Sequence, residues 1–156
     1  MLFRSCTMPL GMEDHRILAG HLRASSSYNY NHGPDRARLN IYNSRGRTGA
    51  WVARYRNTHQ WLQIDLRQLS LIKGIATQGR REAHQWVKSY MISYSRRGVR
   101  FRMYNAYGRV KVRTMELIVS KQNRKSTVCY LENFHARSTH VTLKYPNFSC
   151  MRITSN

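Results

Sequence analysis

The sequence predicts an all-β fold, a sandwich or barrel of short antiparallel strands. Apolar and polar residues alternate with a period of two in several stretches, most clearly at 60–66, where Leu62, Ile64 and Leu66 would share one face. Stretches rich in turn-forming residues separate these segments at intervals of roughly 8–12 residues. No long segment repeats its apolar residues with the 3.6-residue period of a helix. Together these observations favour strands packed face to face or closed into a barrel.

The segment 60–80 is expected to hold two strands joined by a short connection and to lie at the centre of the fold. The second strand would end at Gly79 and take its apolar side chains from Leu71, Ile72, Ile75 and Ala76. A hairpin turn is expected at 96–98. Apolar residues of the other strands are expected at Leu39 and Ile41; Tyr90, Ile92 and Tyr94; Val99, Phe101 and Met103; Val110 and Val112; and Val141, Leu143 and Tyr145. The tryptophans Trp51, Trp61 and Trp86 are expected in the core.

The charge balance points to an anionic partner. The chain has 156 residues, 41% of them hydrophobic, which is enough for one domain with a core. Lys and Arg number 27 against 7 Asp and Glu, a formal net charge of +20. Such a field favours nucleic acid, sulfated glycans or an anionic membrane surface. No segment approaches the ~18–20 apolar residues of a membrane span, and the first residues contain no apolar core of a signal peptide.

The motifs of catalytic and metal sites are missing from the sequence. The seven acids are spread thinly, and Glu13 and Asp14, being adjacent, would face opposite ways on a strand. His135 and His140 are five residues apart, which matches neither helical nor strand spacing of metal ligands. Gly-rich phosphate-binding loops do not occur. We therefore predict no catalytic residue, no metal site and no cofactor, and a protein that is not an enzyme.

A basic stretch with two interpretations runs from Arg96 to Arg113. Seven of its eighteen residues are Lys or Arg, and they are interleaved with Phe101, Tyr104 and Tyr107. Aromatic and basic side chains together are typical of a single-stranded nucleic-acid surface. The other interpretation is a strand with a solvated basic face, and the alternation of apolar residues with arginines at 99–103 favours it.

Several short motifs occur in an order that resembles the discoidin family, also called the coagulation factor five/eight type C domain family. The resemblance is strong over residues 6–104 and weak over 105–156. The motifs are Pro9–Glu13 (PLGME), Ala24–Ser26 (ASS), Ala37–Asn40 (ARLN), Ala50–Trp51 (AW), Gln60–Leu66 (QWLQIDL), Ala76–Arg80 (ATQGR), Trp86–Tyr90 (WVKSY) and Ser93–Ser95 (SYS).

The resemblance implies a jelly-roll-like β-barrel or sandwich of about eight main antiparallel strands, with ligand-binding loops protruding at one end. It implies one domain over 6–154, after a short extension at 1–5. Members are extracellular modules, not enzymes. The loops carried over by position are 26–33, 43–49 and 79–85. By the resemblance, the candidate ligand-binding residues in these loops are Tyr28, Tyr30, His32, Arg45, Arg47, Arg80, Arg81 and His84.

These loops are cationic and aromatic rather than strongly apolar. Tyrosine suits an interfacial depth in a membrane or stacking on a sugar ring. We therefore predict a non-catalytic extracellular adhesion or recognition module that binds anionic phospholipid or carbohydrate surfaces. The alternatives are a protein-binding module of the collagen- or receptor-ligand type and, less favoured, a basic nucleic-acid-binding protein.

The cysteines depart from the family pattern. Cys6 and Cys150 match half-cystines of two family disulfides, but Val52 stands where the partner of Cys150 is usual, and the chain stops before the partner of Cys6. The expected partner position lies eight residues beyond Cys150, roughly 26 Å along an extended strand, too far for Cys6 and Cys150 to pair. We predict no disulfide, with Cys6, Cys129 and Cys150 unpaired within the chain. A fragment of a longer secreted chain would fit these features.

Overall fold

The computed structural model describes residues 10–72, 75–80, 82–83, 85–87, 89–106, 109–110, 112–114, 129–130, 136–147 and 152–155. These residues form strands and short 3-10 turns, with no α-helix among them. No helix in this part of the chain is long and apolar enough to cross a membrane. The elements are η1 (Ala19–His21), β1 (Leu22–Ala24), η2 (Tyr30–His32), η3 (Pro34–Arg36), β2 (Gln60–Ile72), β3 (Ile75–Gln78), β4 (Ser89–Ser95), β5 (Arg102–Met103), β6 (Asn105–Ala106), β7 (Arg109–Val110), β8 (Val112–Thr114), β9 (Cys129–Tyr130), β10 (Ala136–Asn147) and β11 (Arg152–Ser155).

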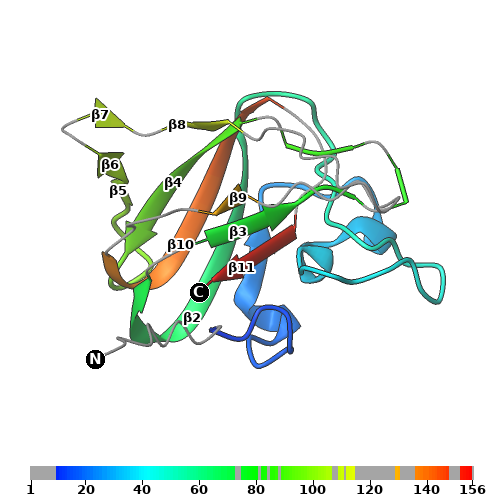
Figure 1. The fold of residues 1–156 in the computed structure, drawn as a ribbon, viewed down its shortest axis with the longest axis horizontal. Coiled ribbons are helices and arrows are strands. Elements are labelled where there is room, and N and C mark those ends of the chain that lie inside the picture. Colours follow the sequence, from blue (N-terminus) through cyan, green and yellow to red (C-terminus); the bar gives the residue numbers. More distant parts are fainter. Residues whose placement is uncertain are drawn as a thin grey trace, which may run out of the picture.

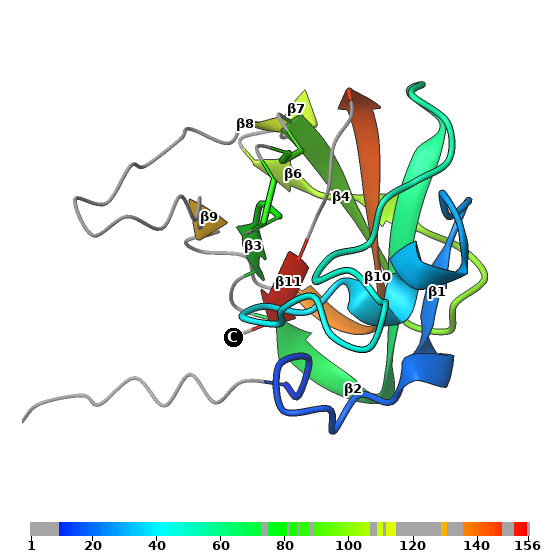
Figure 2. The ribbon, with the colours of Figure 1, turned by 90° about the vertical axis from the view of Figure 1, so that its right-hand side faces the viewer.

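The architecture is all-β and antiparallel, as predicted. The larger sheet has the order β1-β2-β10-β4-β5, and β8 also pairs with β4 (Figure 1). A smaller sheet has the order β11-β3-β9, and β6 pairs with β7. Figure 2 shows the smaller sheet to one side of the larger one. The larger sheet does not close on itself within the described residues. The arrangement is therefore an open jelly-roll-like sandwich.

Strand β2 lies between β1 and β10 in the larger sheet and confirms the predicted alternation. Its side chains Leu62, Ile64 and Leu66 are buried, while the residues between them are half-buried. The strand continues to Ile72, so the connection between the two predicted strands comes later than expected. An irregularity occurs instead at Arg67, which has φ +63°, and its N–H donates to Oδ1 of Asp65. The period of burial breaks there.

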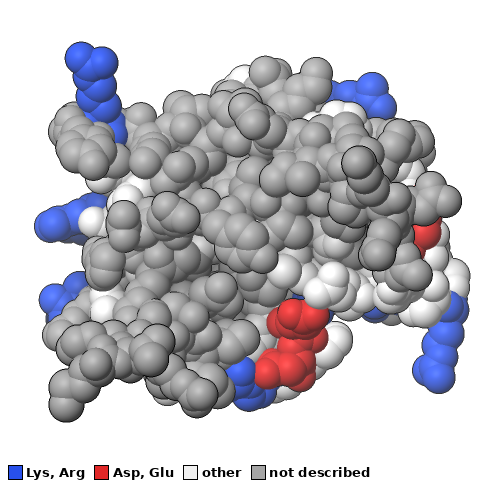
Figure 3. Space-filling model, viewed as in Figure 1, with Lys and Arg blue, Asp and Glu red and all other residues white. Residues whose placement is uncertain are grey.

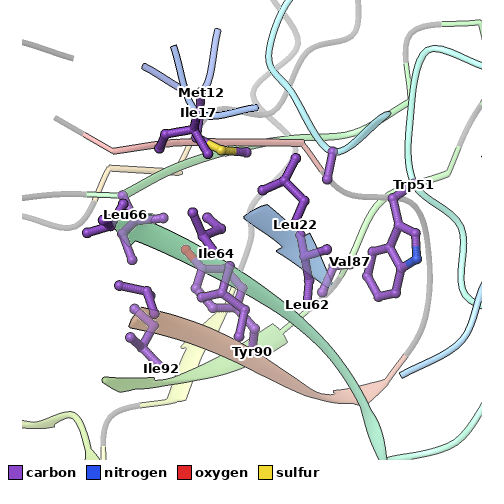
Figure 4. Close-up of a cluster of buried hydrophobic side chains, with 14 of the residues drawn as sticks. Met12, Ile17, Leu22, Trp51, Leu62, Ile64, Leu66, Val87, Tyr90 and Ile92 are labelled. Atoms are coloured by element: carbon purple, nitrogen blue, oxygen red, sulfur yellow. The ribbon is translucent and has the colours of Figure 1, made fainter. Parts of the chain in front are cut away.

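The hydrophobic core lies against β2, β4 and β10. Tyr90, Ile92, Leu62 and Leu143 are completely buried, and Trp51 stands at one end of the cluster (Figure 4). Because Trp61 points to the face opposite Leu62, it is only half-buried, and so is Trp86. The expectation that these two tryptophans belong to the core is therefore wrong, whereas Trp51 confirms it.

The strand predicted to begin at Val99 is the clearest error. Val99 is 82% exposed, and only Arg102–Met103 pair with β4. Gly98 has φ +74° and lies so close to the His140 ring that an added Cβ would come within 2.8 Å of it. The hydroxyl of Ser95 accepts hydrogen bonds from the N–H groups of Arg97 and Gly98. The chain therefore turns tightly over His140, which places Val99 on the outside of the turn.

One arginine, Arg38, is buried among backbone carbonyls. Arg38 is 1% exposed, and its guanidinium donates to the carbonyls of Met12, Ile17 and Asp35. These bonds hold the segment before β1 against the loop 34–39. Burial lowers the pKa of Arg38, yet an arginine keeps its charge at any physiological pH. The three carbonyl acceptors thus compensate a buried cation.

Candidate functional site: the loop end

The segments that connect β1 to β2 all lie at one end of the larger sheet. Ala24 pairs with Leu62, and the N–H of Ser25 donates to the carbonyl of Trp61. The chain therefore leaves β1 beside the first residues of β2 and returns there at Gln60. In Figure 1 these segments, coloured blue to cyan, lie to the right of the sheet. We call the segments 25–59 and 79–85 together the loop end.

The first predicted loop, 26–33, rests on the core through Trp51. The indole Nε1 of Trp51 donates to the carbonyl of Ser26 at 3.0 Å. Further along, the N–H of Tyr28 donates to the carbonyl of Val52, and the N–H of Val52 donates to the carbonyl of His32. The first loop is thus hydrogen-bonded to residues 51–52, which come shortly after the second loop, 43–49.

The first two loops are joined by hydrogen bonds, and an ion pair between Arg47 and Asp35 places Arg47 beside Tyr30. Both the N–H and the hydroxyl of Thr48 donate to the carbonyl of Asn31. Arg47 donates to the carboxylate of Asp35 at 2.9 Å and lies over the Tyr30 ring, with 4.9 Å from its Cζ to the ring centroid. Asp35 therefore holds Arg47 over the Tyr30 ring. This orients an aromatic ring that is itself 82% exposed.

The third loop contacts the second through Glu82. The N–H of Asn43 donates to the Glu82 carboxylate at 3.0 Å. The backbone and guanidinium of Arg80 both donate to Gln85, closing the base of this loop. Burial and the neighbouring Arg80 cation lower the pKa of His32. Both effects favour the neutral form of the His32 ring, whose Nδ1 lies 2.6 Å from Oδ1 of Asn29.

The predicted site residues fall into three groups. Tyr28 and Tyr30 are exposed, and Arg45 is exposed on a tight turn with φ +49°. The side chains of His32, Arg47 and Arg80 take part in contacts within the loop end. The last two, Arg81 and His84, lie outside the described residues. Ligand binding by all eight stays a prediction.

Sequence reasoning missed four residues at this end. Tyr42 and Tyr55 are about half exposed, and the only signal for them was an aromatic residue inside a polar segment. Asp35 and Glu82 hold the loops together, and no local pattern marks an acid that acts this way. Within the described residues no group of three or more His, Cys, Asp or Glu side chains is close enough to hold a metal ion.

The loop end offers tyrosines rather than aliphatic side chains. The large exposed hydrophobic residues in segment 25–59 are Tyr28, Tyr30, Tyr42 and Tyr55. The exposed aliphatic residues of the described chain lie elsewhere, at Leu18, Leu69, Leu71 and Val99. A tyrosine provides a flat apolar face and a hydroxyl that can form hydrogen bonds. The described part of the loop end can therefore stack against a ring and hydrogen-bond around it.

Curated relatives of this chain include two coagulation factors and retinoschisin. The chain is 38% identical over 115 residues to coagulation factor VIII of the dog, covering 70% of this chain and 5% of that protein. It is 43% identical over 105 residues to coagulation factor V of the pig, covering 64% and 4%. Mouse retinoschisin is 36% identical over 91 residues, covering 55% and 39%. The matched region thus spans 4–5% of the two coagulation factors and 39% of retinoschisin.

Solved structures share the fold at low sequence identity. Discoidin II of Dictyostelium discoideum superposes with a TM-score of 0.71 at 22% identity, covering 86% of this chain and 53% of that one. A family 32 carbohydrate-binding module of C. perfringens NanJ, solved in complex with galactose, has a TM-score of 0.60 at 15% identity, covering 89% and 96%. Another module of this type was solved in complex with GalNAc-β-1,3-galactose (TM-score 0.59, 16% identity, covering 88% and 94%).

The family profile described as F5/8 type C domain matches residues 21–146, which is most of the chain. Domains of this type are generally non-catalytic binding modules for carbohydrate, phospholipid or protein, although some occur within enzyme chains. The profile match, the identities with the coagulation factors and the shared jelly-roll fold agree with one another. This chain belongs to the F5/8 type C domain family.

Proposed function

We propose that this chain is a non-catalytic, extracellular recognition module that binds glycans through its loop end. The observation that carries the proposal is the exposed Tyr30 ring, held by Arg47, which is in turn held by Asp35. Arg47 lies on one face of the ring and leaves the other face for a sugar. A sugar ring presents C–H groups that stack on an aromatic face and hydroxyls that accept hydrogen bonds from nearby donors.

The competing ligand, an anionic phospholipid surface, is supported less well by these residues. A bilayer is bound through apolar side chains that enter the interface beside basic ones. The exposed large hydrophobic side chains of segment 25–59 are all tyrosines. Three of them, Tyr28, Tyr30 and Tyr55, have polar residues on both sides in the sequence. The sugar-bound structures with the same fold support glycan as the first class of probe.

Replacing Tyr30 by alanine is expected to weaken glycan binding at least about tenfold, because stacking on an aromatic ring contributes on the order of 1.4 kcal/mol. Tyr30→Phe keeps the ring and is expected to retain most of the affinity. The measurement is binding of the labelled chain to an array of neutral and acidic glycans that includes galactose and N-acetylgalactosamine termini, followed by calorimetry with the strongest binder.

Leu71→Ala is the matched control, since Leu71 is exposed near the far end of β2 and should leave binding unchanged. Co-sedimentation with phosphatidylcholine vesicles, with and without phosphatidylserine, tests the competing ligand. Retention on phosphatidylserine vesicles without binding to any glycan would overturn the proposal. A protein ligand would be indicated instead by binding that survives high salt and does not depend on Tyr30.

A further inference from the structure

A concave surface lies at the end of the larger sheet away from the loop end. It is a half-open groove of about 830 Å³, lined by Leu69, Tyr94, Ser95, Arg96, Arg97, Val99, Arg100 and Arg102. The register places it: Ser95 and Asp65 both pair with His140, whereas Gln60 pairs with Tyr145 at the other end of β10. We call this surface the arginine groove. Its size is within the range of ligand-binding clefts.

The arginine groove has a strong positive charge. Arg96, Arg97, Arg100 and Arg102 are all exposed, and none of the eight lining residues is acidic. Among the described residues, no carboxylate forms an ion pair with Arg97, Arg100 or Arg102. Asp65 is on strand β2, which β10 separates from β4. Its carboxylate oxygens lie 3.6 Å from Nε2 of His140 and 3.7 Å from Nη1 of Arg67.

The turn that carries three of these arginines is held firmly in place. The Ser138 hydroxyl donates to the carbonyl of Ser95 at 2.7 Å, which ties the end of β4 to β10. The Ser95 hydroxyl then accepts from the N–H groups of Arg97 and Gly98, and Gly98 lies against the His140 ring. A preorganised turn loses little entropy when it binds, so the arginines are presented at a fixed place.

We propose that the arginine groove binds a linear sulfated polysaccharide. A guanidinium fork matches the oxygens of a sulfate group with two parallel hydrogen bonds. A concave groove is filled by a chain, whereas a flat bilayer would contact only its rim. Single-stranded nucleic acid is stacked on exposed aromatic rings, and Tyr94, the one aromatic residue among the described residues that line the groove, is half-buried. The exposed aliphatic side chains Leu69 and Val99 offer contacts for the C–H faces of sugar rings.

The chain carries basic side chains in many other places, so net charge alone could retain a polyanion. Figure 3 shows Lys and Arg side chains projecting at several separate edges of one face. The test therefore compares two triple variants that remove the same charge. One is Arg97→Ser, Arg100→Ser and Arg102→Ser in the groove. The control is Arg16→Ser, Arg23→Ser and Arg109→Ser, which are exposed arginines outside both the groove and the loop end.

Binding of a size-defined heparin oligosaccharide is measured by calorimetry for both variants, after thermal unfolding has shown that both are folded. The groove variant is expected to lose at least about tenfold in affinity and the control less than about threefold. Equal losses would overturn the proposal, because they would show non-specific attraction. Groove-dependent binding that is tighter for single-stranded DNA, or for phosphatidylserine vesicles, would overturn it in favour of that ligand. Tyr30→Ala should leave heparin affinity unchanged, which separates this site from the loop end.

Discussion

Replacing the buried Arg38 by methionine is expected to lower the free energy of unfolding by about 2–4 kcal/mol. The substitution removes hydrogen bonds to the carbonyls of Met12, Ile17 and Asp35. A buried carbonyl left without a partner costs about 1–3 kcal/mol, and the release of a buried cation offsets part of the sum. The measurement is urea-induced unfolding followed by fluorescence.

Arg23→Met is the control for this substitution, because Arg23 is exposed on β1 and should change stability by less than about 0.5 kcal/mol. Arg38→Lys is expected to fall between wild type and Arg38→Met, since an ammonium group can reach fewer of the three carbonyls at once. A stability of Arg38→Met equal to that of wild type would show that these hydrogen bonds do not hold the segment before β1.

Replacing Trp51 by alanine is expected to destabilise the chain by about 3–5 kcal/mol, because its ring is almost completely buried. Trp51→Phe keeps most of the ring but removes the bond from Nε1 to the carbonyl of Ser26. It is expected to cost about 1 kcal/mol of stability and to raise hydrogen exchange in the loop 26–33. Both effects are measured by urea unfolding and amide exchange.

Trp86→Phe provides the comparison for Trp51→Phe, because Trp86 is half-buried and none of the hydrogen bonds assigned to the first loop involves it. Amide hydrogen exchange in the loop 26–33 of Trp86→Phe should match that of wild type. If Trp51→Phe and Trp86→Phe gave the same exchange in the loop 26–33, the contact between Trp51 and Ser26 would not be what positions the first loop.

The sequence predicted the sheet well where one rule decides the outcome. In β2 the period of two is set by the pleat of a strand, so the burial of Leu62, Ile64 and Leu66 follows from the order of residues alone. The burial of Tyr90 and Ile92 in β4 follows in the same way. At Arg67 the backbone departs from the pleat, and the alternation rule no longer applies. The prediction therefore placed the break between the two strands before Leu71, whereas β2 continues to Ile72.

The errors have a different origin, in contacts between distant residues. Val99 is exposed because Gly98 turns over His140, which lies 42 positions later in the chain. The burial of Arg38 depends on carbonyls of residues 12 and 17, which no alternation pattern reports. No alternation pattern reports the contacts of Arg47 with Asp35 and Tyr30 either. The loops could be located from the sequence, but not the contacts that orient their side chains.

The most direct test of glycan binding at the loop end is to map the bound ligand on the isotope-labelled chain by amide NMR spectra. The neutral glycan that binds most strongly on the array is titrated into the chain, because a sulfated glycan is expected to bind the arginine groove as well. We expect the shifted amides to lie in the loops 26–33 and 43–49, around Tyr30 and Arg47, with residues 94–102 unchanged. Shifts confined to residues 94–102, or spread evenly over the surface, would contradict recognition by the loop end.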